Sequence, residues 1–237
     1  GNIGQPLIGR LDEIRPQDRV VMELSSFQLE GFGPATPPAR AYPPGGWSPH
    51  GAAVLNITPN HLDRHPSMEA YIAAKSNILR FQGSTDWAVL NADDEHAARL
   101  QPLCVGRVLQ FSLEGRVPQG AFLDGRTLVW APQGDEAFPM CRVDQLRLRG
   151  RHNVANTLAA FAIAGAAGAS REAMVAVARE FAGVEHRLEL VRSLRGVTYY
   201  NDSIATSPER VVGTLRSFYE PGLILAGGRD NHLPGQG

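Results

Sequence analysis

Two mainly apolar runs in the N-terminal part of the chain each end in polar residues. Residues 20–24 lead into two serines, and residues 52–57 lead into a Thr-Pro-Asn turn signal. Short apolar runs with polar ends are typical of buried strands. A helical pattern over 66–82 and a further strand pattern at 87–90 follow them. This alternation predicts an α/β fold, in which helices pack on a mostly parallel sheet and ligands bind where the strands end.

The segments after residue 100 predict more sheet and two more helices. Short apolar runs separated by glycine-rich turn signals over 108–148 indicate a small antiparallel sheet. Residues 153–168 are Ala-rich and nearly all apolar, and residues 171–181 are amphipathic, so both predict helices that pack against a sheet. The proline-rich residues 31–50 indicate a long surface loop.

A second unit begins after Gly183. Its predicted elements are strands at 188–191 and 197–200, a helix at 207–218 and a strand at 223–226. We therefore expect one domain over 1–184 and the beginning of another over 185–237, because the second segment is too short to form a typical α/β domain alone.

The composition excludes several classes of protein. Hydrophobic residues make up 43% and charged residues 20% of the 237 residues, which is typical of a globular chain. The formal charge of -1 gives no general attraction to nucleic acid or to an anionic membrane. The longest run of small apolar residues, 157–169, is too short to span a bilayer, and the two cysteines lack the spacing of a zinc site. We expect a cytoplasmic protein that binds small molecules.

Lys75 is the single lysine among 23 basic residues, and the others are arginines. Arginine can replace lysine on most solvated surfaces, but it cannot supply the neutral amine that covalent or carbamate chemistry needs. Lys75 is therefore a candidate for chemistry. The alternative is a composition biased toward arginine that leaves one lysine by chance.

Glu23, His61 and Lys75 form the first candidate site. Glu23 lies near the end of one predicted strand, His61 follows another, and Lys75 lies on the next predicted helix. Their oxygen and nitrogen atoms would suit Mg²⁺, provided that Lys75 is carbamylated. Alternatively, Glu23 caps a helix and His61 is a hydrogen-bonded loop residue. A further alternative is a metallohydrolase site shared by His61 and His65, although Pro66 disfavours a regular helix there.

A second candidate site lies around the predicted domain junction. It comprises Asn153, the pair His186-Arg187, and the run Asn201-Asp202-Ser203. An asparagine amide can pair with the adenine edge, arginine can bind phosphate, and aspartate can accept hydrogen bonds from ribose hydroxyls. The alternative is structural, with a helix cap at Asn153 and a salt bridge across the junction.

Eight segments of the chain together resemble the Mur ligases in order and spacing. They are residues 1–4 (GNIG), 23–30 (ELSSFQLE), 55–58 (LNIT), 61–64 (HLDR), 73–75 (AAK), 152–153 (HN), 185–189 (EHRLE) and 201–203 (NDS). Residues 23–30 resemble the branch of the family that adds D-glutamate. The resemblance implies a central ATP-binding domain of Mur ligase type over 1–184, followed by the start of a Rossmann-like C-terminal domain over 185–237.

The resemblance also implies an activity. Members of this branch use ATP and Mg²⁺ to join D-glutamate to UDP-N-acetylmuramoyl-L-alanine in peptidoglycan synthesis. The alanyl carboxylate becomes an acyl phosphate, which the D-glutamate amine then attacks. We expect a monomer without nucleic acid or membrane partners.

By matching positions, the resemblance assigns roles to individual residues. Glu23 resembles the ligand of one Mg²⁺, and His61 and carbamylated Lys75 resemble the ligands of a second. Asn153, Arg187 and Asp202 resemble ATP contacts, and His186 would lie beside the reacting groups. Asn2, Ser25 and Gln28 resemble contacts to the UDP-sugar substrate, and Thr206 is a further matching substrate contact.

The chain departs from the family pattern at several points. It contains no phosphate-binding G-x-x-x-x-G-K-[ST] loop, because its single lysine follows Ala74. Ile204 and Asn231 stand where many members have lysine. We therefore expect a fragment that is inactive by itself. Two alternatives stay open: a degenerate homologue that binds a nucleotide or a partner without catalysis, and a sibling ligase of folylpolyglutamate type.

Overall fold

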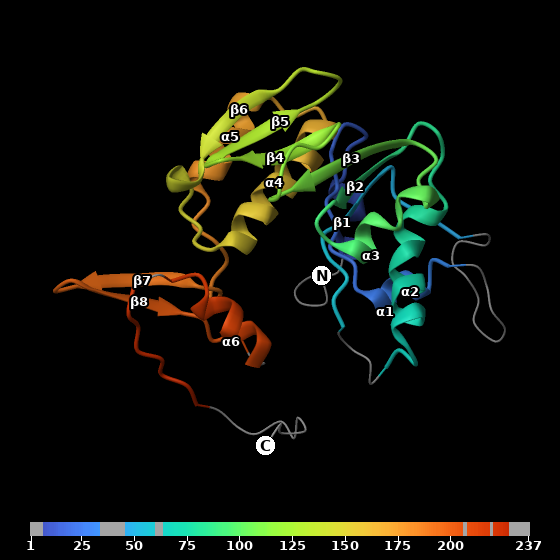
Figure 1. The fold of residues 1–237 in the computed structure, drawn as a ribbon. Coiled ribbons are helices and arrows are strands. Elements are labelled where there is room, and N and C mark those ends of the chain that lie inside the picture. The colour runs from blue at the N-terminus through green and yellow to red at the C-terminus, as the bar shows by residue number, and fades with distance from the viewer. Residues whose placement is uncertain (1–6, 34–45, 60–63, 206–207, 219, 228–237) are drawn as a thin grey trace.

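The computed structural model describes residues 7–33, 46–59, 64–205, 208–218 and 220–227. A six-stranded sheet forms the centre of the fold (Figure 1). The strands follow their sequence order across the sheet, which is β1-β2-β3-β4-β5-β6. The first four strands are parallel to one another, and the last two pair antiparallel. Their bounds are β1 Gly51–Val54, β2 Trp87–Asn91, β3 Arg107–Ser112, β4 Gly120–Asp124, β5 Thr127–Ala131 and β6 Phe138–Arg142.

Helices cover both faces of this sheet. Alternate residues of β2 point to opposite faces, so Val89 joins one hydrophobic cluster while Ala88 and Leu90 join another. The first cluster includes α4 (Arg151–Ala166) and α5 (Arg171–Glu180), and the second includes α2 (Met68–Arg80) and the short α3 (Glu95–Ala98). The α/β fold predicted from the sequence is confirmed.

The helices begin where the sequence places capping residues. The Ser67 hydroxyl accepts a hydrogen bond from the Ala70 amide at the start of α2, and Ser170 does the same for Ala173 at the start of α5. The Ala-rich α4 is apolar on most of its surface because it lies between the sheet and α5, where Leu158 and Ala162 are fully buried.

The antiparallel part predicted at 108–148 is not a separate sheet. Strand β3 extends the parallel sheet, and β4, β5 and β6 continue it, with a shift of register between Leu128 and Val129. Residues 113–119 can join the parallel strands β3 and β4 because these strands overlap in three residue pairs only. The chain therefore needs no crossover helix at this point.

The second unit is an antiparallel hairpin followed by a helix. Strand β7 (Glu189–Leu194) pairs with β8 (Val197–Asn201) through the two-residue turn Arg195-Gly196, and α6 is Pro208–Leu215. Both turn residues have positive φ, at 51° and 81°, as a tight hairpin turn requires. In Figure 1 this orange and red unit lies beside the start of α4, apart from the six-stranded sheet.

Two predicted strands are wrong. Residues 20–24 and 223–226 have no regular structure, and Val21 and Leu225 are 88% and 93% exposed. A strand is stabilised by the ladder that it forms with a neighbour, and within the described residues β1 pairs with β2 alone. Both segments therefore have the apolar pattern of a strand but, in the described part of the chain, no neighbouring strand with which to pair. Most of the loop predicted at 31–50 lies outside the described residues.

The remaining elements are short. They are α1 (Ser26–Glu30) and three 3-10 turns, η1 (Leu7–Glu13), η2 (Gln101–Leu103) and η3 (Val143–Gln145). Among the described residues there is no helix with the length and apolarity needed to cross a bilayer.

Candidate functional site

The carboxyl ends of β1 and β2 are tied together by side chains. The Asn91 amide donates to the Leu55 carbonyl over 2.8 Å, and the Asp94 carboxylate accepts a hydrogen bond from the Ile57 amide over 3.2 Å. The second Asp94 oxygen caps α3 by accepting from the Ala97 amide. In open α/β sheets this edge is where ligands bind.

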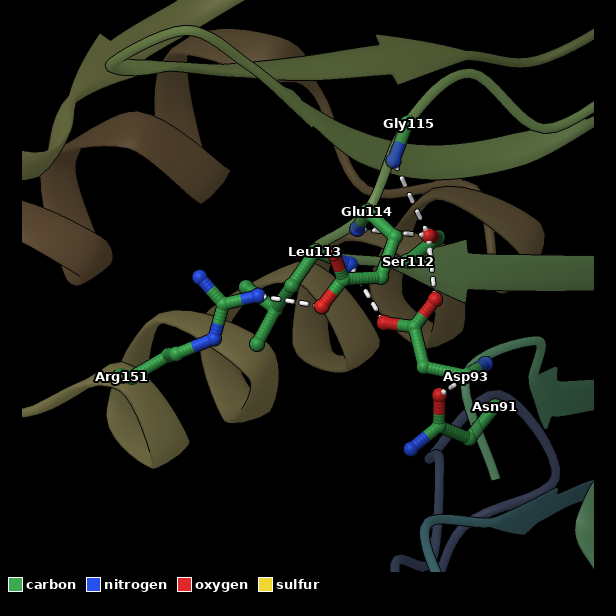
Figure 2. Close-up of polar contacts among 7 residues, drawn as sticks. All are labelled: Asn91, Asp93, Ser112, Leu113, Glu114, Gly115 and Arg151. Carbon is green, nitrogen blue, oxygen red and sulfur yellow. Dashed lines mark hydrogen bonds and ion pairs between the residues drawn. The ribbon is translucent and has the colours of Figure 1, made fainter. Parts of the chain in front are cut away.

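Asp93 extends this network to β3 and α4. Its carboxylate accepts the Ser112 hydroxyl over 2.5 Å and the Leu113 amide over 2.6 Å (Figure 2). The buried Ser112 oxygen in turn accepts the amides of Glu114 and Gly115. Glu114 forms an ion pair with Arg151, the first residue of α4. The ends of three strands and the start of α4 are thus held in one network.

Sequence reasoning missed this network, although a signal was present. The run Asn91-Ala92-Asp93-Asp94 follows an apolar strand, as do the residues that the sequence did single out. Polar side chains at the ends of parallel strands meet at one edge of the sheet. If the polar residues after every predicted strand had been considered, Asn91 and Asp93 would have been among the candidate site residues.

The start of α4 contacts the second unit. The Arg149 guanidinium binds Glu220 over 3.1 Å and lies over the rings of Tyr200 and Phe218, at 5.8 Å and 5.7 Å from their centroids. Gly150, the N-cap residue, has a φ of 93°, and a Cβ atom there would lie 2.4 Å from the Ser217 oxygen. A glycine at position 150 therefore allows Ser217, just after α6, to lie close to the start of α4.

Asn153 lies in the first turn of α4 and does not cap it. Its amide donates to the Arg149 carbonyl over 2.7 Å, whereas the N-cap position is Gly150 without a side-chain cap. The structural alternative of a helix cap at Asn153 is therefore wrong. A salt bridge across the junction does exist, but Arg149 and Glu220 form it.

Two residues of the second candidate site, Arg187 and Asp202, influence the neighbouring His152 electrostatically. Desolvation lowers the pKa of His152, the Arg187 guanidinium lowers it further, and the Asp202 carboxylate opposes the shift. Asp202 is itself fixed, because one carboxylate oxygen accepts the Leu188 amide over 3.0 Å and the other accepts the Thr214 hydroxyl. The junction thus gathers a cation, an anion and an imidazole next to the start of α4.

Replacing Arg187 by alanine is expected to raise the pKa of His152. The guanidinium disfavours the imidazolium, so its removal favours protonation, and an NMR titration of the His152 ring would report the shift. Arg192→Ala, on β7, removes an exposed arginine that is not among the causes of the lowered pKa and is the matched control. A titration that is identical in Arg187→Ala and wild type would contradict the proximity of these two residues.

The same lowered pKa makes stability depend on pH. The pKa of His152 in the folded chain lies below its ordinary value of 6.5. As the pH falls, the unfolded chain therefore binds a proton at this residue before the folded chain does. Neutral His152 therefore makes its full contribution to the free energy of unfolding above pH about 6.5. This contribution is lost as the pH falls toward the pKa of the folded state.

His186 lies in a strained turn. His186 and Leu188 have positive φ values of 65° and 47°, which are costly for residues other than glycine. The His186 amide donates to Glu189 over 2.8 Å, and the Asn201 amide lies 2.9 Å from the His186 Nδ1 atom. Such over-determined, strained backbone is common at functional sites, which fits the predicted role of this segment.

The predicted substrate contacts Ser25 and Gln28 form the start of α1. The Gln28 amide donates to the Ser25 hydroxyl over 3.3 Å, and the Gln28 side-chain oxygen accepts the Ser25 amide over 2.9 Å. Ser25 is therefore the cap of α1, so Glu23 does not cap this helix. Glu23 is exposed and lies two residues before the cap.

Lys75 lies on α2, as predicted, and is half-buried. Its ammonium nitrogen lies 5.1 Å from the centroid of the Tyr71 ring. Within the described residues, no hydrogen bond or ion pair joins Lys75 to Glu23. Their convergence stays a prediction, and the predicted residues Asn2, His61 and Thr206 lie outside the described part of the chain.

His65 is not available as a metal ligand. Its Nε2 atom lies 2.9 Å from the Ser26 hydroxyl, and its Nδ1 atom lies 3.2 Å from a Glu30 oxygen. The metallohydrolase alternative therefore has no support from this residue. Across the described ranges there is no cluster of three or more histidine, cysteine or acidic side chains that could hold a metal.

The sheet has polar side chains at its carboxyl edge, and residues of types that suit nucleotide contacts lie near the start of α4. This is the architecture of a ligand-binding α/β domain. The family described as "Mur ligase middle domain" matches residues 10–164. The chain belongs to the Mur ligase family.

Curated relatives carry a more specific name. Proteins named "UDP-N-acetylmuramoylalanine–D-glutamate ligase" from Clostridium kluyveri and Clostridium novyi are each 43% identical over 234 residues, which is 99% of this chain and 47% of the relative. The chain therefore spans about half the length of the curated relatives that it matches.

Solved structures support the fold. MurF from Acinetobacter baumannii has a TM-score of 0.57 at 24% identity over 72% of this chain and 37% of its own. UDP-N-acetylmuramate-alanine ligase MurC from Thermotoga maritima has a TM-score of 0.55 at 21% identity over 72% of this chain and 38% of its own. At these identities the likeness shows the fold alone.

Proposed function

We propose that this chain contributes the central domain, over 1–184, and the first part of a C-terminal domain, over 185–237, to a ligase that joins D-glutamate to UDP-N-acetylmuramoyl-L-alanine. The observation that carries the proposal is the 43% identity over 99% of the chain to relatives named for this reaction. The reaction belongs to peptidoglycan synthesis. We further propose that the chain by itself is inactive.

The proposed chemistry is acyl activation followed by amide formation. The alanyl carboxylate attacks the γ-phosphorus of ATP, which gives an acyl phosphate and ADP. The amine of D-glutamate then attacks the carbonyl carbon, loses a proton, and inorganic phosphate leaves with the former carboxylate oxygen. Positioning of the three reactants and stabilisation of the developing charge are the main contributions that a protein makes to such a reaction.

The junction supplies the proposed ATP contacts. Asn153 projects from the first turn of α4, and Arg187 and Asp202 lie close enough to His152 to influence its pKa. A guanidinium suits phosphate, and a carboxylate suits ribose hydroxyls. His186, in the strained turn beside Arg187, is proposed to lie next to the reacting groups.

Glu23, His61 and carbamylated Lys75 are the proposed ligands of two Mg²⁺ ions. The donor chemistry fits, because Glu23 offers an exposed carboxylate just before α1 and Lys75 is half-buried without a described acidic partner. When bound, Mg²⁺ neutralises negative charge on the transferring phosphoryl group. Carbamylation would exchange the ammonium that now faces Tyr71 for an anion.

The remaining assignments follow the family resemblance. Asn2, Ser25, Gln28 and Thr206 are proposed to contact the UDP-sugar and amino-acid substrates. Ser25 and Gln28 already lie together in the capping box at the start of α1. We propose that the protein acts as a cytoplasmic monomer without membrane or nucleic acid partners.

The test is a ligation assay on the natural gene product that contains these residues. We expect ADP release and product formation with UDP-N-acetylmuramoyl-L-alanine, D-glutamate, ATP and Mg²⁺. L-Glutamate and other amino acids are the competing substrates, and each should give less product. Turnover that prefers another amino acid, or no turnover with D-glutamate, would overturn the assignment.

A non-catalytic homologue is the second candidate, and Ile204 is the observation that favours it. The Ile204 side chain is 47% exposed beside the His186 turn, where many family members have lysine. If the absence of lysine at position 204 weakens D-glutamate binding, Ile204→Lys is expected to lower the KM for D-glutamate about tenfold. The new lysine would form a charge-assisted hydrogen bond with a carboxylate of the substrate.

The matched control for this variant is Ile204→Met, which keeps an apolar side chain at that position. Steady-state kinetics would separate the two variants. Binding of Mg-ATP in equilibrium dialysis, without ligation by either variant or by wild type, would favour the non-catalytic homologue.

A further inference from the structure

Helix α1 depends on contacts with its surroundings. It has five residues, Ser26–Glu30, and an isolated helix of that length is unstable in water. Its main partner is α2, which is the only helix that packs closely against it within the described residues. The residues that hold α1 against α2 therefore decide where Ser25 and Gln28 lie.

His65 is the central contact between the two helices. Its side chain is almost fully buried, its Nε2 atom lies 2.9 Å from the Ser26 hydroxyl, and its Nδ1 atom lies 3.2 Å from Glu30. The ring stacks on Phe27 with centroids 5.3 Å apart and an interplanar angle of 3°. Three residues of α1 thus contact one imidazole.

Both ring nitrogens of His65 have a polar neighbour on α1. The Nε2 atom and the Ser26 hydroxyl form a hydrogen bond, and the Nδ1 atom lies within ion-pair distance of the Glu30 carboxylate, which can only accept. Among the described residues, no buried side-chain nitrogen or oxygen lacks a partner. Serine, histidine and glutamate in this order resemble a hydrolase triad. Ser26 is only 4% exposed, however, so a substrate cannot reach its hydroxyl.

The opposite side of the imidazole contacts α2. The His65 and Tyr71 rings are 5.1 Å apart at an angle of 55°, and Tyr71 in turn lies under the Lys75 ammonium at 5.1 Å. One continuous set of contacts therefore runs from α1 through His65 and Tyr71 to Lys75.

We propose that His65 is a positioning residue that fixes α1 against α2 and so sets Ser25 and Gln28 relative to Lys75. The consequence for substrate binding rests on the function proposed above. The position of α1 itself does not rest on that function and can be measured in this chain.

A second anchor keeps α1 near α2 when His65 changes. The buried Asn77 amide donates to the Leu29 carbonyl over 3.0 Å. Because this bond does not involve His65, a change at His65 is expected to loosen the helix without unfolding the domain.

The test compares His65→Phe with His65→Gln by amide hydrogen exchange. Phenylalanine keeps an aromatic ring but removes the hydrogen bond to Ser26 and the polar contact with Glu30, whereas glutamine can retain the bond to Ser26. We expect the amides of Leu29 in α1 and of Gly31 and Phe32 directly after it to exchange about tenfold faster in His65→Phe, because the buried hydrogen bond to Ser26 and the contact with Glu30 are lost. Glutamine should restore part of the protection, and α4 should exchange at an unchanged rate.

His96→Phe, on α3, is the matched control, and its α1 amides should exchange as in wild type. Unchanged α1 protection in His65→Phe would overturn the proposal. Equal acceleration in α1 and α4 would overturn it as well, because His65 would then contribute only to global stability.

Steady-state kinetics test the consequence for substrate binding. In the ligation assay, His65→Phe is expected to raise the KM for the UDP-sugar substrate about tenfold and to leave the KM for ATP unchanged, because α1 carries only the proposed UDP-sugar contacts. An unchanged KM for the UDP-sugar would overturn this consequence. If wild type does not ligate D-glutamate, the proposed function fails, while hydrogen exchange still decides the role of His65.

Discussion

Replacement of Lys75 by arginine is expected to reduce kcat for ligation at least about 100-fold, because a guanidinium cannot form the carbamate that the proposed metal site needs. The change keeps the positive charge and most of the side-chain length. Lys75 is half-buried on α2, and its ammonium makes no described ion pair that arginine would break. The stability of the domain should therefore change little.

Carbamylation can be observed without turnover. Addition of ¹³C-bicarbonate is expected to give a carbamate signal in the NMR spectrum of the wild-type chain and none in Lys75→Arg. Arg80→Lys, in the last turn of the same helix, is the matched control and should ligate as wild type does. Full activity of Lys75→Arg, or the same carbamate signal in both proteins, would remove the role assigned to Lys75.

Gly120→Ala is expected to lower the free energy of unfolding by about 3 kcal/mol or more, which is the largest effect that we predict for a single methyl group. Gly120 begins β4 with a φ of 131°, and a Cβ atom there would lie 1.8 Å from the Gln110 carbonyl oxygen of β3. That oxygen belongs to backbone in the middle of the sheet, so it cannot rotate away. The parallel pairing of β3 and β4 would have to break.

Gly125→Ala separates this clash from the cost of a positive φ. Gly125 lies in the turn between β4 and β5 with a φ of 56°, and nothing lies within 4 Å of a Cβ atom there. Its replacement should cost about 1 kcal/mol, which is the conformational penalty alone. Urea denaturation of both variants provides the measurement. Equal destabilisation would show that the approach of Gly120 to β3 is not as close as described.

The helices of the domain could be predicted from the sequence because their signals are local. The pattern over 66–82 corresponds to α2 at Met68–Arg80, and the apolar run at 153–168 corresponds to α4 at Arg151–Ala166. Serine caps and periodic apolar residues act within one or two turns of the chain. The short apolar runs predicted β1 and β2 for the same reason.

The candidate site was predicted in part. Arg187 and Asp202, two members of the predicted junction set, lie close enough to His152 at the start of α4 to influence its pKa, whereas the sequence analysis had not singled out His152 for that set. The network of Asp93 and Ser112 was missed: the polar residues after β2 were visible in the sequence, but their pairing with the end of β3, 19 residues further on, was not. The role of His65 depends on burial, which no local pattern reports.

The sequence by itself determined the class of fold, the positions of the main helices and the residue types that point to nucleotide chemistry. Only the tertiary structure decided whether an apolar run became a strand, which residues meet at the carboxyl edge, and which polar groups are buried. The physical reason is that helices and caps form from neighbouring residues, whereas strand pairing and burial depend on segments brought together from distant parts of the chain. Residues 20–24 therefore carry a strand pattern without forming a strand in the described structure.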